Sequence, residues 1–332
     1  MDEWEDFTLE TMTAAINGHG FVPGQLGQLG IFNEDGVATT TIKIEEQDGT
    51  LSIIEPSPRG GPGSTVDDDE RSTIAFEIDH YEINDSVKAE EVQGIRMFGS
   101  NDQAETLLNR VDGKTQKHAR LFDTTLEHQR IGTIKGVVVS GKGKVLHNLY
   151  DRFGIAVPAP VALGLGVEQP KIISTLKGDV VHQIEDELDD FFDHIHAMAG
   201  RGFMAKLWDQ EAIRETFLAD NQGYKLRDGA PDVLTAGGIT FERYKTGRKA
   251  TAANQNAAFI ADDEAQVFPV GVQDLFLTRF APADLEETVN TIGLPRYSRQ
   301  YKMQNGKGRH LDSQMNAISL CTKPKVLLRL TA

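Results

Sequence analysis

Cysteine and long apolar runs are scarce in this sequence, and each shortage excludes a class of protein. The 332 residues include one cysteine, Cys321, so no disulfide can form within the chain, and a lone thiol is typical of a reducing compartment. The uncharged, mostly apolar run from Phe153 to Val167 is too short to span a bilayer and contains two prolines. We therefore expect a soluble protein.

Positive charge is also in short supply. Lys and Arg total 34 against 50 Asp and Glu, which gives a net charge of −16. Sequence-specific binding to nucleic acid depends on clustered Lys and Arg, so this balance argues against it. The first six residues, Met-Asp-Glu-Trp-Glu-Asp, lack the basic region of a secretory signal peptide, and we expect an unsecreted protein.

The common nucleotide-binding and nucleophile motifs are incomplete. Gly113-Lys114-Thr115 resembles the end of a phosphate-binding loop, but Leu108 stands where that motif requires a glycine. Gly164-Leu165-Gly166 lacks the third glycine of a dinucleotide fingerprint. No Gly-x-Ser-x-Gly occurs, and the strand-like context of Cys321 is typical of a buried thiol. We predict no catalytic residues and no cofactor.

Two histidines with carboxylates close by form a candidate metal site. His194 and His196 have Asp189, Asp190 and Asp193 near them, and such donors can bind zinc or iron. The segment is predicted to be helical, and residues two apart in a helix do not share a face. We therefore interpret it as a solvated acidic helix without metal. A metal-dependent enzyme stays an alternative that metal analysis would detect.

A long amphipathic helix is predicted from Ser100 to Ile131. Ser100 and Gln103 have the spacing of a capping box. Apolar residues then recur at steps of three and four, with Thr115 filling one polar position; they are Ala104, Leu108, Val111, Ala119, Phe122 and Leu126. Such a helix spans roughly 45 Å. Its narrow apolar stripe is typical of a helix that lies across the outside of a sheet.

Two segments carry apolar residues that they cannot bury by themselves. Residues 1–36 are rich in glycine, which offers little core, and we favour an arm that orders against another subunit over a floppy tail. Residues 37–84 alternate as strands around an Asp48-Gly49 hairpin turn, then carry a glycine–proline tip at 56–63 and an acidic run at 67–70. The sequence thus predicts two extended arms.

The rest of the chain predicts a hairpin followed by a second domain. Strands flank a glycine-rich turn between residues 133 and 149. Apolar steps from Val181 to Met198 predict one unbroken helix that Gly200 ends, and Asp209 is a plausible N-cap for another. A strand is expected at 239–244 and a short helix at 283–291. The segment 318–330 is expected to return to the first sheet, which would make the first domain discontinuous.

An ordered set of segments resembles the lambda-type tailed-phage major capsid proteins, the capsid protein E family. The resemblance covers nearly the whole chain and departs from the family at Met315–Ile318. Five places carry it: Phe21-Val22-Pro23-Gly24; Asp48–Leu51 with Ser57–Pro62; Glu91–Arg96; Gly237–Tyr244; and Phe280–Asp284, Thr288–Thr291 and Gly293–Pro295 ahead of Cys321–Pro324.

The resemblance implies an α+β chain with the tailed-phage/herpesvirus major capsid protein fold. Its parts would be an N-terminal arm (1–36), an extended β-arm or E-loop (37–84), a peripheral domain (85–169) with the spine helix 100–131, an axial domain (170–300), and a return to the peripheral domain (301–332). Hexamers and pentamers would form the icosahedral head shell around double-stranded DNA. An encapsulin-type compartment shell is the alternative, which a particle holding cargo enzyme would select.

The resemblance also implies that functional residues lie at contacts between subunits. They are Phe21, Pro23, Leu26, Leu29, Arg59, Gly60, Gly61, Pro62 and Gly63. No lysine lies between Pro56 and Glu70 to form a covalent link there, so another clamp, such as a decoration protein, would lock the shell. Scaffold and portal proteins are the other expected partners, in a virion assembled in the bacterial host cytoplasm. An acidic inner wall would repel packaged DNA.

Overall fold

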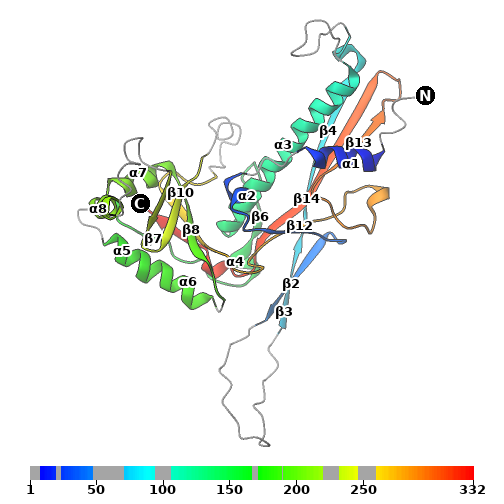
Figure 1. Cartoon of the computed structure of the whole chain (residues 1–332). Coiled ribbons are helices and arrows are strands. Elements are labelled where there is room, and N and C mark those ends of the chain that lie inside the picture. The colour runs from blue at the N-terminus through cyan, green and yellow to red at the C-terminus, as the bar shows by residue number, and fades with distance from the viewer. Residues whose placement is uncertain are drawn as a thin grey trace, which may run out of the picture. The chain divides into compact units, whose positions relative to one another are not determined.

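The chain forms two compact units of mixed helix and strand, which confirms the α+β class. The computed structural model describes residues 8–19, 24–47, 71–93, 106–166, 171–188, 190–219, 232–245 and 259–332. Unit 1 comprises residues 1–42, 77–130 and 276–320, and unit 2 comprises residues 43–76, 131–275 and 321–332 (Figure 1). Unit 1 is therefore discontinuous. The predicted division into N-terminal arm, β-arm, peripheral domain, axial domain and return segment stays a prediction. The two units are defined only by contacts within one chain and do not test the roles of those parts.

Unit 1 is built on a five-stranded sheet. The strand order is β1-β12-β14-β13, and β4 also pairs with β14. β1 runs parallel to β12, whereas β13 and β4 run antiparallel to β14. The elements of the unit are α1 (Leu9–Gly18), α2 (Gln25–Leu29), β1 (Asn33–Gly36), β4 (Asp79–Lys88), α3 (Leu107–Ile134, which ends beyond the unit), β12 (Phe276–Phe280), β13 (Tyr297–Lys302) and β14 (Gly308–Cys321).

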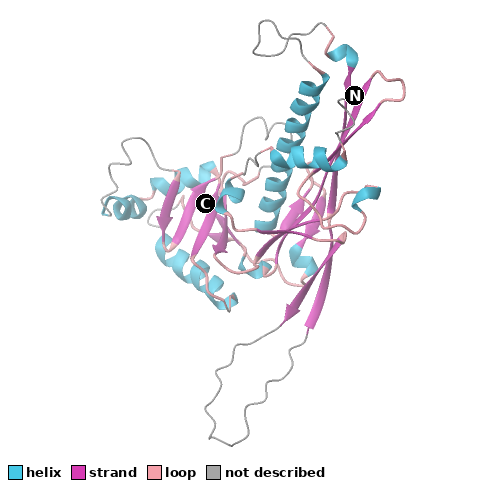
Figure 2. Cartoon of the chain, turned by 45° about the vertical axis from the view of Figure 1, so that its right-hand side comes forward, coloured by secondary structure: helices cyan, strands magenta, loops and turns pink. Residues whose placement is uncertain are grey.

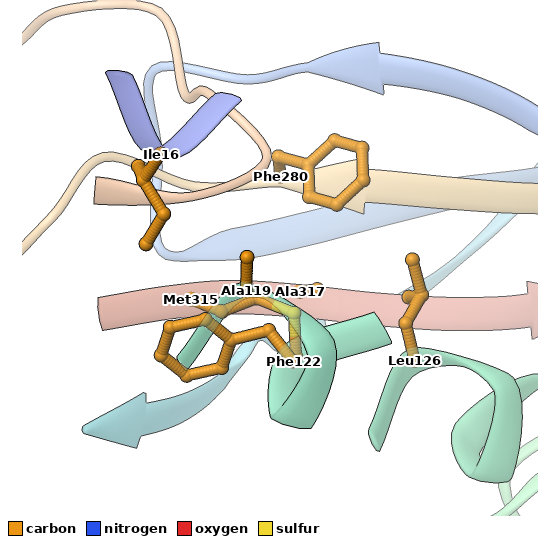
Figure 3. Packing of buried hydrophobic residues seen from close by; sticks show 7 residues of the cluster. All are labelled: Ile16, Ala119, Phe122, Leu126, Phe280, Met315 and Ala317. Atoms are coloured by element: carbon orange, nitrogen blue, oxygen red, sulfur yellow. The ribbon is translucent and has the colours of Figure 1, made fainter. Parts of the chain in front are cut away.

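The long helix α3 packs its apolar stripe on this sheet. Figure 3 shows the cluster, in which side chains of α3 meet those of α1, β12 and β14. Its buried members are Ile16, Ala119, Phe122, Leu126, Phe280, Met315 and Ala317. Met315 and Ala317 are two apart, so they share one face of β14. The predicted stripe is confirmed from Val111 to Leu126, whereas Leu108 is exposed; residues 100–105 lie outside the described part.

Unit 2 is built on a six-stranded sheet with helices beside it (Figure 2). The strand order is β7-β15-β11-β8-β10-β9, and two-stranded ladders β2–β3 and β5–β6 accompany it. Its elements are β2 (Thr41–Gln47), β3 (Arg71–Glu77), β5 (Val137–Val139), β6 (Val145–Asn148), α4 (Leu149–Arg152), β7 (Val161–Ala162), α5 (Ile172–Thr175), α6 (His182–Glu187), β8 (His194–Ala199), α7 (Arg201–Asp209), α8 (Glu211–Ala219), β9 (Val233–Ala236), β10 (Ile239–Arg243), β11 (Glu264–Val270) and β15 (Leu328–Thr331).

The single helix predicted from residue 181 to residue 198 is wrong. A π-helical turn joins α5 to α6, the helix ends at Glu187, and residues 194–199 form β8. β8 pairs with β10 on one edge and β11 on the other, and Ile195 to Ala199 are buried. Pairing on both edges outweighs the helical spacing of the apolar residues. Gly200 is the N-cap of α7, and Asp209 is the last residue of α7.

Two hairpin turns join strands of unit 2, and the second of them was predicted. Ala236 pairs with Ile239, so β9 and β10 are joined by a two-residue turn at Gly237-Gly238. Both glycines have positive φ, 60° and 88°, which is the conformation of a type I′ hairpin turn. The hairpin expected at 133–149 is β5–β6, although Ile134 belongs to α3.

The last segments differ in detail from expectation. Residues 283–291 contain only one 3₁₀ turn, Glu286–Thr288, in place of a helix. β14 joins the sheet of unit 1, as expected of a late strand, but β15 pairs with β11 and β7 in unit 2. A 3₁₀ turn at Pro324–Val326 separates them. No helix in the described ranges is long and apolar enough to cross a membrane.

Candidate functional site

Three buried charged residues on α3 hold the N-terminal segments. Asp123, Glu127 and Arg130 are spaced by four and three, so their side chains share one face of the helix. Each is at most 6% exposed. Because a buried charge is costly unless it is paired, the partner of each residue determines where a neighbouring segment can lie.

Asp123 anchors α1 through Arg296. The Arg296 guanidinium donates to Asp123 Oδ1 at 2.5 Å and to the carbonyl oxygens of Ile16 and His19 at 3.1 and 3.3 Å. It thus bonds to the last turn of α1, where carbonyl groups lack helical partners. Asn17 Nδ2 returns a bond of 2.8 Å to the carbonyl oxygen of Arg296.

Glu127 fixes the start of α2. Its carboxylate accepts hydrogen bonds from the backbone N–H groups of Leu26 and Gly27 at 2.9 and 3.2 Å. A Cβ at Gly24 would lie 2.1 Å from Glu127 Cδ, so only glycine permits this approach. Leu26 is fully buried in its own chain.

Arg130 holds the segment that leads into β1. Its guanidinium pairs with Glu34, donates to Thr278 Oγ1 at 3.4 Å, and lies 4.9 Å from the centre of the Phe32 ring. A cation over an aromatic face is attractive. β1 is thereby fixed beside β12, with Asn33 opposite Leu277 in the parallel register.

The N-terminal segment therefore folds on its own chain wherever it is described. Leu26 and Phe32 are buried within the chain, so neither needs another subunit for its burial, and the assignment of Leu26 to a subunit contact stays a prediction. Leu29 is half-buried. The other predicted contact residues, Phe21, Pro23 and Arg59 to Gly63, lie outside the described residues, and their role stays a prediction.

A second polar cluster joins the first half of α3 to β4 and β14. Lys114 Nζ lies 3.0 Å from Asp85 Oδ1. His118 Nδ1 is 3.0 Å from Ser313 Oγ, and His118 Nε2 is 3.4 Å from Asp85 Oδ2. Ser, His and Asp are thus in contact, but Nδ1 faces the serine and Nε2 the aspartate, which is the reverse of a hydrolase triad. Ser313 has no exposed surface, so no substrate can reach its hydroxyl and the cluster acts as a structural contact.

Burial has shifted the pKa values of several groups. Desolvation lowers the pKa of His118 against the pull of Asp85. Burial works to raise the pKa of Asp85, but the Ser86 amide and the Lys114 ammonium outweigh it and lower that pKa. Burial raises the pKa of Cys321 to about 12, so the thiol stays protonated. The expectation of a buried thiol is confirmed.

We expect His118 to make the chain sensitive to mild acid. A histidine with a lowered pKa binds protons more readily when the chain is unfolded, so its stabilising effect is complete above about pH 6.5 and is lost as pH falls. His118→Gln should flatten the decline in the free energy of unfolding between about pH 6.5 and 5, measured by urea titration. The exposed His194→Gln is the control, and an unchanged slope in His118→Gln would contradict the assignment.

The candidate metal residues lie on a strand. His194 and His196 are two apart on β8, so they share a face, and their ring centres are 6.1 Å apart. Our placement of them on a helix is therefore wrong. His196 is buried beside Phe268 and lies 3.4 Å from Glu242. Among the residues that the structure describes, no group of three or more His, Cys, Asp and Glu could hold a metal ion.

An exposed apolar patch lies beside a large groove in unit 1. Val289, Ile292 and Leu294 are 66%, 68% and 45% exposed; we call these residues the 289–294 patch. The groove has a volume of about 1010 Å³ and is lined by α1, α3 and the 287–297 segment. Core residues Leu126 and Phe280 also line it. Exposed apolar area of this kind is typical of a binding surface.

The base of the β2–β3 ladder is anchored in unit 2. Phe76 on β3 is fully buried, with its ring 6.3 Å from that of His147 and 6.1 Å from that of Phe153. Arg152 lies over the same ring at 6.0 Å. The described parts of β2 and β3 end at residue 47 and begin at residue 71. The predicted glycine–proline tip lies between them, outside the described residues.

Sequence reasoning missed the three charged residues of α3. The helical steps of four, three and four join Ala119, Asp123, Leu126 and Arg130. Asp123 and Arg130 therefore lie on the same face of the helix as the apolar stripe. A charge at a position that the helical period assigns to the core is a signal of a buried, paired group. That signal is present in the sequence, although the identity of the partners is not.

The chain is similar to phage capsid proteins over nearly its whole length. Residues 8–332 match the model of the family described as Phage major capsid protein E. The chain is 22% identical to the major capsid protein of Salmonella phage Felix O1 (98% of this chain, 96% of the relative) and 23% identical to that of Pseudomonas phage KPP10 (92% and 91%). The capsid structure of Cyanophage P-SCSP1u matches with a TM-score of 0.51 at 11% identity, covering 91% of this chain and 86% of that one.

Proposed function

The chain belongs to the phage major capsid protein E family, and we propose that it assembles as hexamers and pentamers into the icosahedral head shell of a tailed phage. The observation that carries this proposal is the family match over residues 8–332. It is a major capsid protein, a structural component of a virion, and it has the tailed-phage capsid fold. The shell would enclose double-stranded DNA without sequence-specific binding, in keeping with the net charge of −16.

The surface of unit 1 supports assembly from identical copies. When one surface of a chain binds a different surface of an identical copy, the contact can repeat from copy to copy. The copies form a closed ring if the rotation between neighbours adds up to a full turn. The 289–294 patch and the neighbouring groove leave apolar side chains uncovered in a single chain, and a second copy would bury them. Burial of apolar surface is the main driving force of such association.

The two arms would add contacts between copies. The tip residues Arg59 to Gly63 would meet the next subunit, together with Phe21, Pro23 and Leu29. The ladder β2–β3, fixed at its base by Phe76, would carry the tip outward. Since no lysine lies between Pro56 and Glu70, a decoration protein would lock the shell in place of a covalent link. A scaffold and a portal protein would direct assembly in the bacterial host cytoplasm.

Electron cryo-microscopy of the assembled product tests this function. The chain is produced in bacteria together with its scaffold protein, and particles are separated from free subunits by sedimentation. We expect closed shells of five- and six-membered rings, with Arg59 to Gly63 of one copy against its neighbour. The same chain left as free subunits under these conditions would contradict the proposal. A particle filled with a cargo enzyme instead of DNA would also contradict it.

A further inference from the structure

The loop that carries the 289–294 patch is shaped by its own hydrogen bonds. We call residues 283–294 the docking loop. Thr288 is buried, and its hydroxyl donates to the carbonyl oxygens of Ala283 and Leu285 at 2.6 and 3.0 Å. The N–H and the hydroxyl of Thr291 both donate to the carbonyl oxygen of Thr288, at 3.2 and 2.8 Å. These bonds fix the backbone of the loop without any contact from another molecule.

Glycines hold the end of the docking loop against the sheet of unit 1. The N–H of Gly293 donates to the carbonyl oxygen of Val37 at 3.0 Å, and the N–H of Val37 donates to that of Phe280 at 2.8 Å. A Cβ at Gly293 would lie 2.0 Å from the Phe280 carbonyl oxygen, and a Cβ at Gly36 would lie 2.2 Å from the Gly293 carbonyl oxygen. The loop is therefore attached to β1 and β12 through backbone contacts that only glycine allows.

Asn290 takes a backbone conformation that costs free energy. Its φ is 61°, in the left-handed region that residues other than glycine rarely adopt. Asparagine tolerates this region, whereas alanine populates it roughly fivefold less or worse, because Cβ approaches the next carbonyl oxygen. Val289 and Ile292 on either side are 66% and 68% exposed, so the conformation buries neither of them. A strained residue that brings no burial within its own chain is typical of a functional surface.

A second copy can supply the surface that complements the docking loop. Asp284 and Glu286 are exposed, and neither makes an ion pair with any other residue that the structure describes. Lys302 and Lys307 at the β13–β14 turn are also exposed and unpaired among those residues, and Tyr301 beside them is 48% exposed. Acidic and apolar groups on one surface thus match basic and aromatic groups on another. Both surfaces belong to unit 1, so every copy carries both.

We propose that Asn290 is a positioning residue for assembly, and that its left-handed backbone holds the docking loop in the form that a second copy binds. It acts through Val289 and Ile292, which this form turns outward. A surface that already has its bound form loses less conformational freedom on binding, so affinity depends on the backbone of Asn290 more than on its side chain. This inference rests on the proposed assembly into a shell and names what shapes one contact within it.

Two substitutions at position 290 separate the backbone from the side chain. Asn290→Gly and Asn290→Ala both remove the amide group, but only glycine adopts positive φ without a steric cost. We expect Asn290→Gly to assemble at nearly the unmodified concentration of free chain, measured by sedimentation, and Asn290→Ala to need roughly fivefold more or higher. In the unassembled Asn290→Ala chain the amides of Thr291 and Gly293 should exchange faster by a similar factor, measured by hydrogen exchange with mass spectrometry.

Asp274 supplies the matched control, because it is exposed and has a φ of 52° but belongs to unit 2. Asp274→Ala should assemble at nearly the unmodified concentration, even if urea unfolding shows that the free chain is less stable. An equal loss of assembly in this control would attribute the effect to general destabilisation and overturn the proposal.

The pair of variants at position 290 gives two further outcomes that would overturn the proposal. Equal losses in Asn290→Gly and Asn290→Ala would assign the effect to the side chain. Normal assembly of both would show that the second copy does not need the left-handed form. Failure of the unmodified chain to form shells would instead contradict the proposed function, and hydrogen exchange in the free chain would still show whether Asn290 fixes the loop.

Discussion

Asp123→Ala should lower the free energy of unfolding of the unassembled chain by about 3–5 kcal/mol, because it leaves the Arg296 guanidinium buried without its carboxylate. Both side chains are about 5% exposed, so water cannot replace the lost partner. The anchor of α1 is lost with it, and the amides of Leu9–Gly18 should exchange faster with solvent. Urea unfolding gives the first quantity, and hydrogen exchange with mass spectrometry gives the second.

A neighbouring pair supplies the control for this prediction. Arg299 and Glu287 lie 3.2 Å apart, but their side chains are 40% and 49% exposed. Arg299→Ala should therefore cost about 0–1 kcal/mol. Replacing both buried partners, as Asp123→Leu with Arg296→Met, should recover much of the loss, since it leaves no buried charge unpaired. Equal effects of Asp123→Ala and Arg299→Ala would show that burial of the pair does not matter.

The apolar stripe of α3 in unit 1 was predictable, because one face of this helix packs on one face of the sheet. The stripe from Val111 to Leu126 lies at the helical period, and a 28-residue helix with one buried side leaves that period intact. The glycine-rich turn between β5 and β6 of unit 2 was predictable for a similar reason, because Gly143 there has a φ of 81°, which glycine adopts without strain. In each case the determining interactions lie within a few residues of one another.

Long-range partners account for what the sequence did not reveal. Asp123, Glu127 and Arg130 contact residues 173, 101 and 96 positions away, and no local pattern identifies such partners. β8 shows the same limitation. Its apolar residues fit a helical period, but pairing with β10 and β11 makes it a strand that is buried on both sides. Phe191, expected on the buried face of a helix, is instead 99% exposed before that strand.

Assembly should depend on the 289–294 patch more strongly than folding does. Val289→Asp with Ile292→Asp changes two exposed side chains, so we expect the free energy of unfolding of the free chain to move by only about 0.5 kcal/mol or less per site. In the shell the same carboxylates would be buried against a second copy without partners, which is costly at every subunit contact. We expect the concentration of free chain needed for assembly to rise roughly a hundredfold or more.

Sedimentation of particles against free chain at a series of concentrations measures this effect. Val145→Asp with Val157→Asp is the matched control, because both valines are also exposed, at 51% and 64%, but neither lines the groove of unit 1. The control should assemble at nearly the unmodified concentration, since scattered exposed apolar residues are ordinary. An equal loss in the control would attribute the effect to added surface charge. Normal assembly of the 289–294 variant would mean that the second copy does not cover the patch, and the groove beside it would then need another occupant.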